Sequence, residues 1–285
     1  MAGTLYVVAT PIGNLEDITV RALRILREVA LIAAEDTRRT AHLLMRYGIT
    51  TRTTSLHEHN EHRKSPALVA RLESGDSIAL VSDAGTPTVS DPGAHLIAQA
   101  IASHIRVEAI PGPNAALAAL SVSGLLADSF VFLGFPPTRA KDRNGWMERL
   151  RTARTLVVFY EAPHRILQTL DEIRTKVGDV HVVVARELTK AHEELVRGPI
   201  SSILSKRLMP RGEFVVLADV GRITEIETSP IADATSTAQM VHEFGLMTKA
   251  DALTRRQAIS TLARKYGMTT REAYQAVEDA KRSGS

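Results

Sequence analysis

The sequence lacks cysteine altogether, is poor in aromatic residues (4%) and contains no long apolar run. Without cysteine the chain has no disulfide, thiolate metal ligand or cysteine nucleophile, and it suits a reducing compartment. No apolar stretch reaches bilayer-spanning length, and the N-terminus lacks the charged-then-apolar order of a secretion signal. We therefore expect a cytoplasmic protein that does not bind membranes.

Five short apolar runs in the first part of the chain predict strands, over residues 4–9, 30–34, 52–56, 78–81 and 107–110. Between them, apolar residues at helical spacing predict helices over 17–28, 40–47, 66–73, 92–103 and 114–123. This alternation predicts an α/β fold with a parallel sheet. Ligands of such sheets bind beyond the carboxyl ends of the strands, so we expect the polar residues that follow each run to line one crevice.

The rest of the chain predicts a second α/β domain and a basic tail. Strands are expected over 130–135, 155–160, 181–185 and 213–219, helices over 164–177 and 200–208, and a loop over 139–143. We place an N-terminal α/β domain at 1–120, a C-terminal α/β domain at 121–222, a linker at 223–247 and a helical tail at 248–285. From Lys249 to Ser285 there are eight Lys or Arg and four Asp or Glu. The tail fits a helix-turn-helix that meets an anionic partner, but a structural helix pair with a solvated basic face remains equally open.

Two loops of the first domain are candidate ligand contacts. Pro11-Ile12-Gly13-Asn14 matches neither the dinucleotide fingerprint nor the P-loop, which disfavours a nucleotide-phosphate cradle. Small residues in 82–87 let the backbone approach a ligand closely, and Asp83 can accept a hydrogen bond from a ligand amine or hydroxyl. A plain turn with an Asp cap is the alternative.

Histidines and ion-pairing residues also follow predicted strands. His57, His59 and His62 do not complete a zinc ligand set, so we expect no metal and assign them to a polar substrate or to loop shape. In the second domain, Arg165, Arg186 and Lys190 can hold phosphate oxygens, or can pair with Glu161 and Glu187.

Seven motifs in chain order resemble those of the bacterial 16S rRNA (cytidine 2′-O)-methyltransferases, a branch of the tetrapyrrole methylase superfamily of class III methyltransferases. They occupy residues 8–19, 34–38, 82–87, 91–93, 111–116, 159–161 and 185–190. Relatives that act on tetrapyrroles carry Gly-Asp-Pro where this chain has Gly85-Thr86-Pro87, which favours the rRNA branch.

The resemblance implies a tetrapyrrole-methylase-like fold of two α/β domains, with S-adenosylmethionine as methyl donor in the cleft between them, and a homodimer. It implies a cytidine ribose in the decoding region of 16S rRNA, in the small ribosomal subunit, as the substrate. The donor-binding positions that it implies are Pro11, Ile12, Gly13, Asp83, Ala84, Gly85, Thr86, Val89, Ala115, Ala116, Tyr160 and Glu161.

For this reaction the protein must align a ribose oxygen with the methyl group and take or share the hydroxyl proton. Asp36 and Glu187 are the candidates for the proton, and Arg186 and Lys190 are candidate phosphate clamps. The alternative for Asp36 is a helix cap. We expect RNA contacts from Arg38, His57, His59, Asn60 and Arg165.

Two other functions remain as alternatives. One is a class III methyltransferase with a tetrapyrrole or protein acceptor, although few aromatic residues and a polar crevice disfavour a flat macrocycle. The other is a non-enzymatic nucleic-acid-binding regulator that uses the terminal helices.

Overall fold

The computed structural model describes residues 2–206, 208–221, 243–244, 247–248, 254–265, 270, 273–275 and 277. The chain divides into two compact units, Met1–Ile223 and Thr224–Ser285. In the described part of the chain, no helix is both long enough and apolar enough to cross a membrane.

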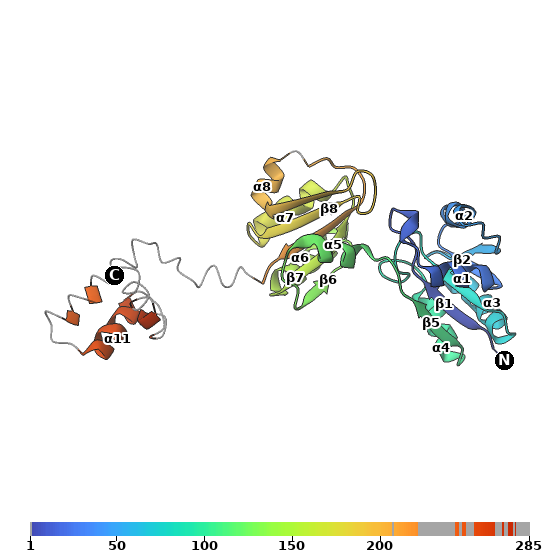
Figure 1. Ribbon diagram of the computed structural model, residues 1–285, viewed down its shortest axis with the longest axis horizontal. Helices are drawn as coiled ribbons and strands as arrows, with labels where there is room; N and C mark the ends of the chain where they lie inside the picture. The colour runs from blue at the N-terminus through green and yellow to red at the C-terminus, as the bar shows by residue number, and fades with distance from the viewer. Residues whose placement is uncertain are drawn as a thin grey trace. The chain divides into compact units, whose positions relative to one another are not determined.

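The first half of the larger unit is a five-stranded sheet in which all strands are parallel, as predicted (Figure 1). In chain order the strands are β1 (Thr4–Val8), β2 (Leu31–Ala34), β3 (Thr53–Ser55), β4 (Ile78–Val81) and β5 (Arg106–Ile110). Their spatial order is β3-β2-β4-β1-β5. The central strands β2 and β4 are buried along their whole length, which explains their uninterrupted apolar sequences.

Helices cover both faces of this sheet. α1 (Val20–Glu28) and α2 (Thr37–Arg46) pack on one face, and α3 (Glu61–Glu73) and α4 (Ala94–Ala102) pack on the other. The short 3₁₀ helix η1 (Leu15–Asp17) precedes α1, which begins after the capping hydroxyl of Thr19. Each predicted helix is present, with ends that differ by a few residues. The largest difference is in α3, which begins five residues before Pro66.

The second sheet is mixed. Its strands are β6 (Phe130–Phe132), β7 (Leu156–Glu161), β8 (His181–Arg186), β9 (Glu194–Pro199) and β10 (Phe214–Asp219), in the spatial order β6-β7-β10-β8-β9. β6 pairs parallel to β7, whereas β10 runs antiparallel to both β7 and β8, and β9 runs antiparallel to β8.

α6 (Ala140–Thr152), α7 (Ile166–Lys176) and α8 (Ile200–Ser205) pack on one face of the second sheet. The opposite face packs against α5 (Ala115–Ser123) and Ile12, which belong to the first half of the chain. A single apolar cluster therefore joins the two α/β halves.

One prediction for the second half was wrong, and one strand was missed. Residues 139–143, expected to be a loop, are the N-cap and first turn of α6, because Trp146, Met147 and Leu150 form a buried face further along the helix. Strand β9 was not predicted, because this edge strand is only partly buried and lacks an apolar run.

In the smaller unit, α11 (Arg255–Lys265) follows Thr254, whose backbone N–H and hydroxyl both donate hydrogen bonds to the side-chain oxygen of Gln257. Ala258, Ile259, Leu262 and Ala263 are buried with Ala273 and Val277, as well as Phe244. These apolar side chains form a small core within the smaller unit. The turn of the expected helix-turn-helix, and nearly all of the expected linker, lie outside the described residues.

Glu61 joins α3 to α4. Its carboxylate, in a side chain that is almost fully buried, accepts hydrogen bonds from the backbone N–H groups of Gly93 (3.1 Å), His95 (2.7 Å) and Leu96 (3.2 Å). These are the unsatisfied donors of the first turn of α4, where the helix dipole favours a negative charge. Glu61 thereby also fixes the end of the 82–93 loop.

We expect Glu61→Ala to lower the free energy of unfolding by ~3 kcal/mol, because three buried N–H groups lose a charged acceptor. Glu61→Gln keeps an acceptor oxygen without the charge and should cost about half as much. Urea denaturation measures both effects, and Glu73→Ala, at the exposed C-terminal end of the same helix, is the control. Equal stabilities for Glu61→Ala and Glu73→Ala would contradict this role.

Candidate functional site

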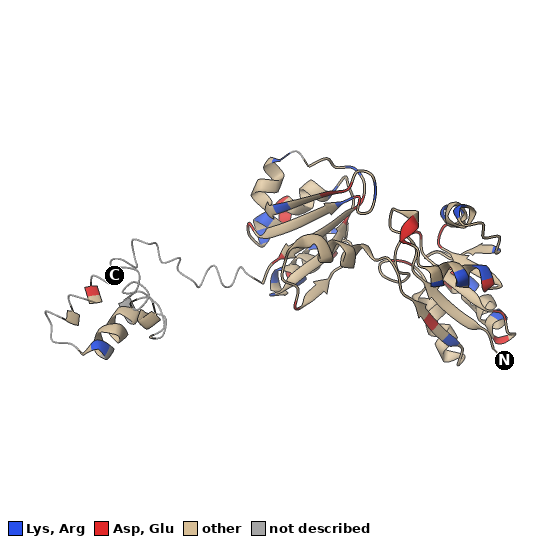
Figure 2. Cartoon of the chain, in the orientation of Figure 1, with Lys and Arg blue, Asp and Glu red and all other residues tan. Residues whose placement is uncertain are grey.

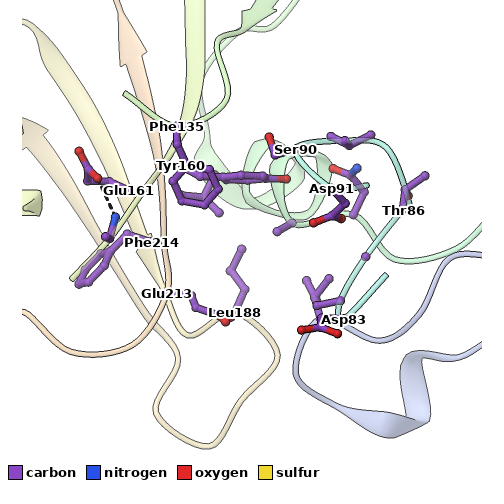
Figure 3. Close-up of a pocket in the computed structure, with 18 of the residues that line it drawn as sticks. Asp83, Thr86, Ser90, Asp91, Phe135, Tyr160, Glu161, Leu188, Glu213 and Phe214 are labelled. Atoms are coloured by element: carbon purple, nitrogen blue, oxygen red, sulfur yellow. Dashed lines mark hydrogen bonds between the residues drawn. The ribbon is translucent and has the colours of Figure 1, made fainter. Parts of the chain in front are cut away.

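A pocket of about 420 Å³ lies between the carboxyl edge of the parallel sheet and the second sheet (Figure 3). Nine of the twelve candidate donor-binding residues line it: Ile12, Asp83, Ala84, Gly85, Thr86, Val89, Ala115, Tyr160 and Glu161. The other three, Pro11, Gly13 and Ala116, are their sequence neighbours and are not part of the lining. The loops that follow β1, β4 and β5 thus meet at one place, as the topology of a parallel sheet requires.

Backbone hydrogen bonds hold these loops together. Thr10 and Gly85 exchange two bonds, of 2.9 and 3.0 Å, and the Thr86 hydroxyl donates to the carbonyl of Pro113 at 3.2 Å. Gly85 has a φ of +76°, and Thr88 and Ser90 adopt left-handed φ values of +72° and +69°. Non-glycine residues in that region cost on the order of 1 kcal/mol each, a strain that concentrates at functional sites.

Carboxylates dominate the wall formed by the first sheet. Asp83 Oδ1 accepts from the backbone N–H of Asp36 (2.9 Å), and Glu35 Oε2 accepts from the backbone N–H of Asp83 (3.1 Å). The cation opposite them is Arg39, which approaches Asp83 at 3.4 Å and whose side chain is 65% exposed. Asp91 completes this wall of the pocket.

The electrostatics of this wall favour a cationic ligand. Burial raises the pKa of Glu35, with a further contribution from the charge of Asp83. Burial raises the pKa of Asp91 to about 6, and the charge of Glu35 adds to the effect. Burial and mutual repulsion make the ionised form of these carboxylates costly. A positively charged ligand that binds among them stabilises this ionised form.

The wall formed by the second sheet is aromatic and apolar. Tyr160 lies between Phe132 and Phe135, with ring centroids at 4.9 and 5.4 Å. In Figure 3 its hydroxyl points toward Ser90 and Asp91. That oxygen accepts a hydrogen bond from the backbone N–H of Ala116, but burial is the larger effect and raises the pKa of Tyr160.

Glu161 sits at the end of this wall in a buried network. Its carboxylate pairs with Arg165 at 2.6 Å and accepts from the Thr169 hydroxyl (2.5 Å) and the Ala162 N–H (2.7 Å). Arg165, an RNA-contact candidate, also donates to the carbonyl of Pro136 at 3.1 Å. In this structure its guanidinium therefore organises the pocket wall.

Three catalytic candidates, Arg186, Glu187 and Lys190, lie behind the pocket lining rather than in it. Lys190 Nζ lies 2.9 Å from the carboxylates of both Glu187 and Glu213, and Arg186 pairs with Glu194 at 2.9 Å. The hydrogen bond from Lys190 lowers the pKa of Glu187. Burial alone would lower the pKa of Lys190. The hydrogen bonds to Glu213 and Glu187 outweigh this effect, so the pKa is raised.

The loop that carries Lys190 packs tightly against the loop after β1. A Cβ added to Gly13 would lie 2.5 Å from Lys190 Cγ and 2.9 Å from the Leu188 carbonyl oxygen, so only glycine fits. The Asn14 N–H donates to the Thr189 hydroxyl at 3.0 Å. Gly13 thus permits the close approach of the two halves, although it does not line the pocket.

The fourth catalytic candidate, Asp36, is also outside the lining. It caps α2 by accepting from the Arg38 N–H at 2.8 Å, and its carboxylate pairs with the exposed Arg38 guanidinium at 2.8 Å. The side-chain hydrogen bond from Arg38 holds the pKa of Asp36 well below its usual range. Figure 2 shows the basic residues of α2.

The remaining RNA-contact candidates follow β3, at the same edge of the sheet. Asn60 is buried, and its side chain accepts from the His57 N–H (3.0 Å) and contacts His57 Nε2 (2.8 Å), so it orients the histidine. His59 is exposed, with its ring centroid 6.0 Å from that of His57. Among the described residues, no group of three or more His, Asp or Glu is arranged to hold a metal ion.

The sequence analysis missed more than half of the lining. The missed residues are Glu35, Arg39, Ser90, Asp91, Asn114, Phe135, Ala162, Pro163, Leu188, Gly212, Glu213, Phe214 and Val215. Glu35 directly follows β2, and Asp91 lies in the loop after β4, so their place inside two of the noted motifs was the available signal. Residues 212–215 carried no such signal in the sequence. β10 runs antiparallel to β7 and β8, so its amino end, not its carboxyl end, lies at the pocket.

Comparisons with known proteins agree with this fold. Residues 4–204 match the family described as Tetrapyrrole (Corrin/Porphyrin) Methylases. A diphthine synthase structure has a TM-score of 0.63 at 16% identity, covering 76% of this chain and 90% of that one. A Thermus thermophilus uroporphyrin-III-C-methyltransferase has a TM-score of 0.53 at 20% identity, covering 79% and 98%. At these identities the two structures support the fold alone.

Closer relatives share much more of the sequence. The Pseudomonas aeruginosa protein named ribosomal RNA small subunit methyltransferase I is 47% identical over 82% of this chain and 84% of its own. The proteins of that name from Halalkalibacterium halodurans and Escherichia coli O157:H7 are 41% and 43% identical, over 95% and 88% of this chain and 93% and 89% of their own. The chain therefore belongs to the tetrapyrrole methylase family, in the group of relatives that carry this name.

Proposed function

We propose that this protein transfers the methyl group of S-adenosylmethionine to the ribose 2′-hydroxyl of a cytidine in the decoding region of 16S rRNA. The names of its relatives support an rRNA acceptor in the small ribosomal subunit. The observation that carries the proposal is the pocket, which pairs a carboxylate wall with an apolar and aromatic one. In keeping with the sequence motifs, we also propose a homodimer.

The residues of the pocket fit this donor. S-adenosylmethionine supplies an electrophilic methyl group on a positively charged sulfonium, and it also carries an ammonium group and an adenine ring. Asp83, Asp91 and Glu35 provide the negative charge that a sulfonium and an ammonium require. Ile12, Val89 and Leu188 provide apolar surface for a purine, and the pocket has the size usual for ligand sites of this class.

A ribose hydroxyl is a weak nucleophile, so its proton must be taken or shared during transfer. Asp36 and Glu187, the candidates named from the sequence, are held in ion pairs outside the pocket lining. Asp91 lines the pocket, and we propose it as the general base. A carboxyl that titrates near neutrality suits this role better than one that is always ionised.

The acceptor RNA would approach along the open edge of the parallel sheet. Arg38 and His59 are exposed there, beside His57. For Arg186 or Lys190 to clamp a phosphate, each would have to exchange its present carboxylate partners for phosphate oxygens. Arg38 can bind phosphate more readily, because its side chain is 88% exposed.

The proposed function predicts that the purified protein transfers tritium from methyl-labelled S-adenosylmethionine to small ribosomal subunits from a strain that lacks the corresponding gene. The label should appear in 16S rRNA and, after nuclease digestion, in 2′-O-methylcytidine. Label in ribosomal protein, or transfer to a tetrapyrrole but not to RNA, would overturn the proposal.

A bulky side chain that fills the pocket should strongly weaken donor binding. Ala115 lines the pocket at the start of α5, and an indole there would occupy the space, so Ala115→Trp should weaken S-adenosylmethionine binding at least ~100-fold. Ser121→Trp places the same side chain at an exposed position of the same helix and should bind normally. Titration calorimetry measures both, and normal binding by Ala115→Trp would place the donor elsewhere.

Asp91→Asn should slow methyl transfer at saturating donor by ~100-fold or more, because the proposed base is lost. The same variant should be more stable than the wild type near pH 7. The folded protein keeps the Asp91 proton up to about pH 6, but the unfolded chain releases it near 3.8, so the free energy of unfolding falls as pH rises between these values. With solvent screening of this partly exposed carboxyl, the gain should be roughly 1 kcal/mol.

Denaturant unfolding at several pH values and single-turnover transfer test the two effects separately. Asp128→Asn, at an exposed aspartate outside the pocket lining, should change neither. If Asp91→Asn reacts at the wild-type rate, Asp91 is not the base, and Asp36→Asn and Glu187→Gln become the decisive variants.

A further inference from the structure

The aromatic wall contains one ring that nothing in the proposed donor site requires. The chain has only 12 aromatic residues, and Phe132, Phe135 and Tyr160 gather at this wall. Phe132 and Tyr160 are partly buried, but Phe135 is 51% exposed even though it lines the pocket. It therefore stands at the mouth of the pocket, with its ring centroid 5.4 Å from that of Tyr160 and about half of its surface open to solvent.

Buried contacts hold the backbone on both sides of this exposed ring. Gly134, with a left-handed φ of +61°, accepts from the Tyr160 N–H at 3.0 Å. Arg165 donates to the carbonyl of Pro136 at 3.1 Å, and Arg143 donates to that of Pro137 at 3.3 Å.

These two arginines are anchored in the core of the second domain. Their side chains are only 17% and 12% exposed, and each pairs with a carboxylate, Arg165 with Glu161 and Arg143 with Glu172. A loop held in this way keeps Phe135 in place without a ligand. Such preorganisation lowers the entropy cost of binding a partner to the ring.

We infer that Phe135, supported by Tyr160, is a stacking platform for a nucleobase of the acceptor RNA. The inference rests on the proposed function and names a residue that binds the acceptor. Proteins read unpaired RNA largely by stacking splayed bases on aromatic rings, and such stacking can hold one nucleotide in place for modification. A half-exposed ring at the mouth is available to a base that arrives from outside, and the carboxylates beyond it attract the cationic donor.

The test compares four variants at Phe135 in methyl transfer to small ribosomal subunits. Phe135→Ala should raise the KM for subunits about 10-fold or more, because stacking on one aromatic ring contributes that much to binding. Phe135→Trp and Phe135→Tyr keep an aromatic face and should stay close to the wild type. Phe135→Leu keeps an apolar side chain without a π face and should behave like Phe135→Ala.

Binding of S-adenosylmethionine, measured by calorimetry, should be unchanged in all four variants. Phe130→Ala removes a half-exposed phenylalanine outside the pocket lining and should change neither quantity. Circular dichroism checks that each variant is folded.

Three results with the variants would overturn the inference alone. An unchanged KM for subunits in Phe135→Ala means that the ring holds no acceptor base, and weaker donor binding means that it holds the adenine of the donor instead. A KM in Phe135→Leu as low as in the wild type means that only apolar contact matters. If the wild-type protein itself transfers no methyl group to RNA, the proposed function fails and the inference falls with it, whereas an active wild type with unaffected variants removes the inference alone.

Discussion

The pairing of Thr10 with Gly85 is the contact on which the pocket depends. Two short backbone bonds continue the β1–β4 contact past the ends of both strands and hold the first loop against the 82–93 loop. Because Asp83 precedes this bridge, its carboxylate lies where it accepts from the Asp36 N–H and meets Arg39. This bridge joins the ends of β1 and β4, and the hydrogen bonds of Asp83 with Asp36 and Glu35 add the end of β2 to the same wall.

Most of this wall could be predicted from the sequence, since it obeys a topological rule. Once five apolar runs alternate with helices, a parallel sheet follows, and the residues after each run must meet at one edge. Ile12, Asp83 and Ala115 lie together for that reason. The opposite wall follows no such rule, because in a mixed sheet either end of a strand can face the ligand. The start of β10 and the loop at Phe135 are set by pairing and by buried arginines that only the fold reveals.

The roles of single charged residues were harder to predict than their positions. Asp36, Glu187 and Lys190 do follow strands, but the sequence cannot tell which partner each one meets. Lys190 meets two carboxylates, and Asp36 meets the backbone and side chain of Arg38. By contrast, Asp91 lacks a close cationic partner among the interactions described, so burial governs its titration.

In the reaction that we propose, the two walls therefore have different roles. The parallel sheet supplies carboxylates that are costly to keep ionised, a cost that a cationic donor offsets when it binds. The mixed sheet supplies a rigid aromatic surface on which, as we infer, a base of the acceptor can stack. Since α5 and Ile12 belong to the same apolar cluster as β7, β8 and β10, the walls are joined through a shared core. That shared core fixes the spacing between the walls, and the in-line transfer from a sulfonium to a ribose oxygen that we propose would depend on this spacing.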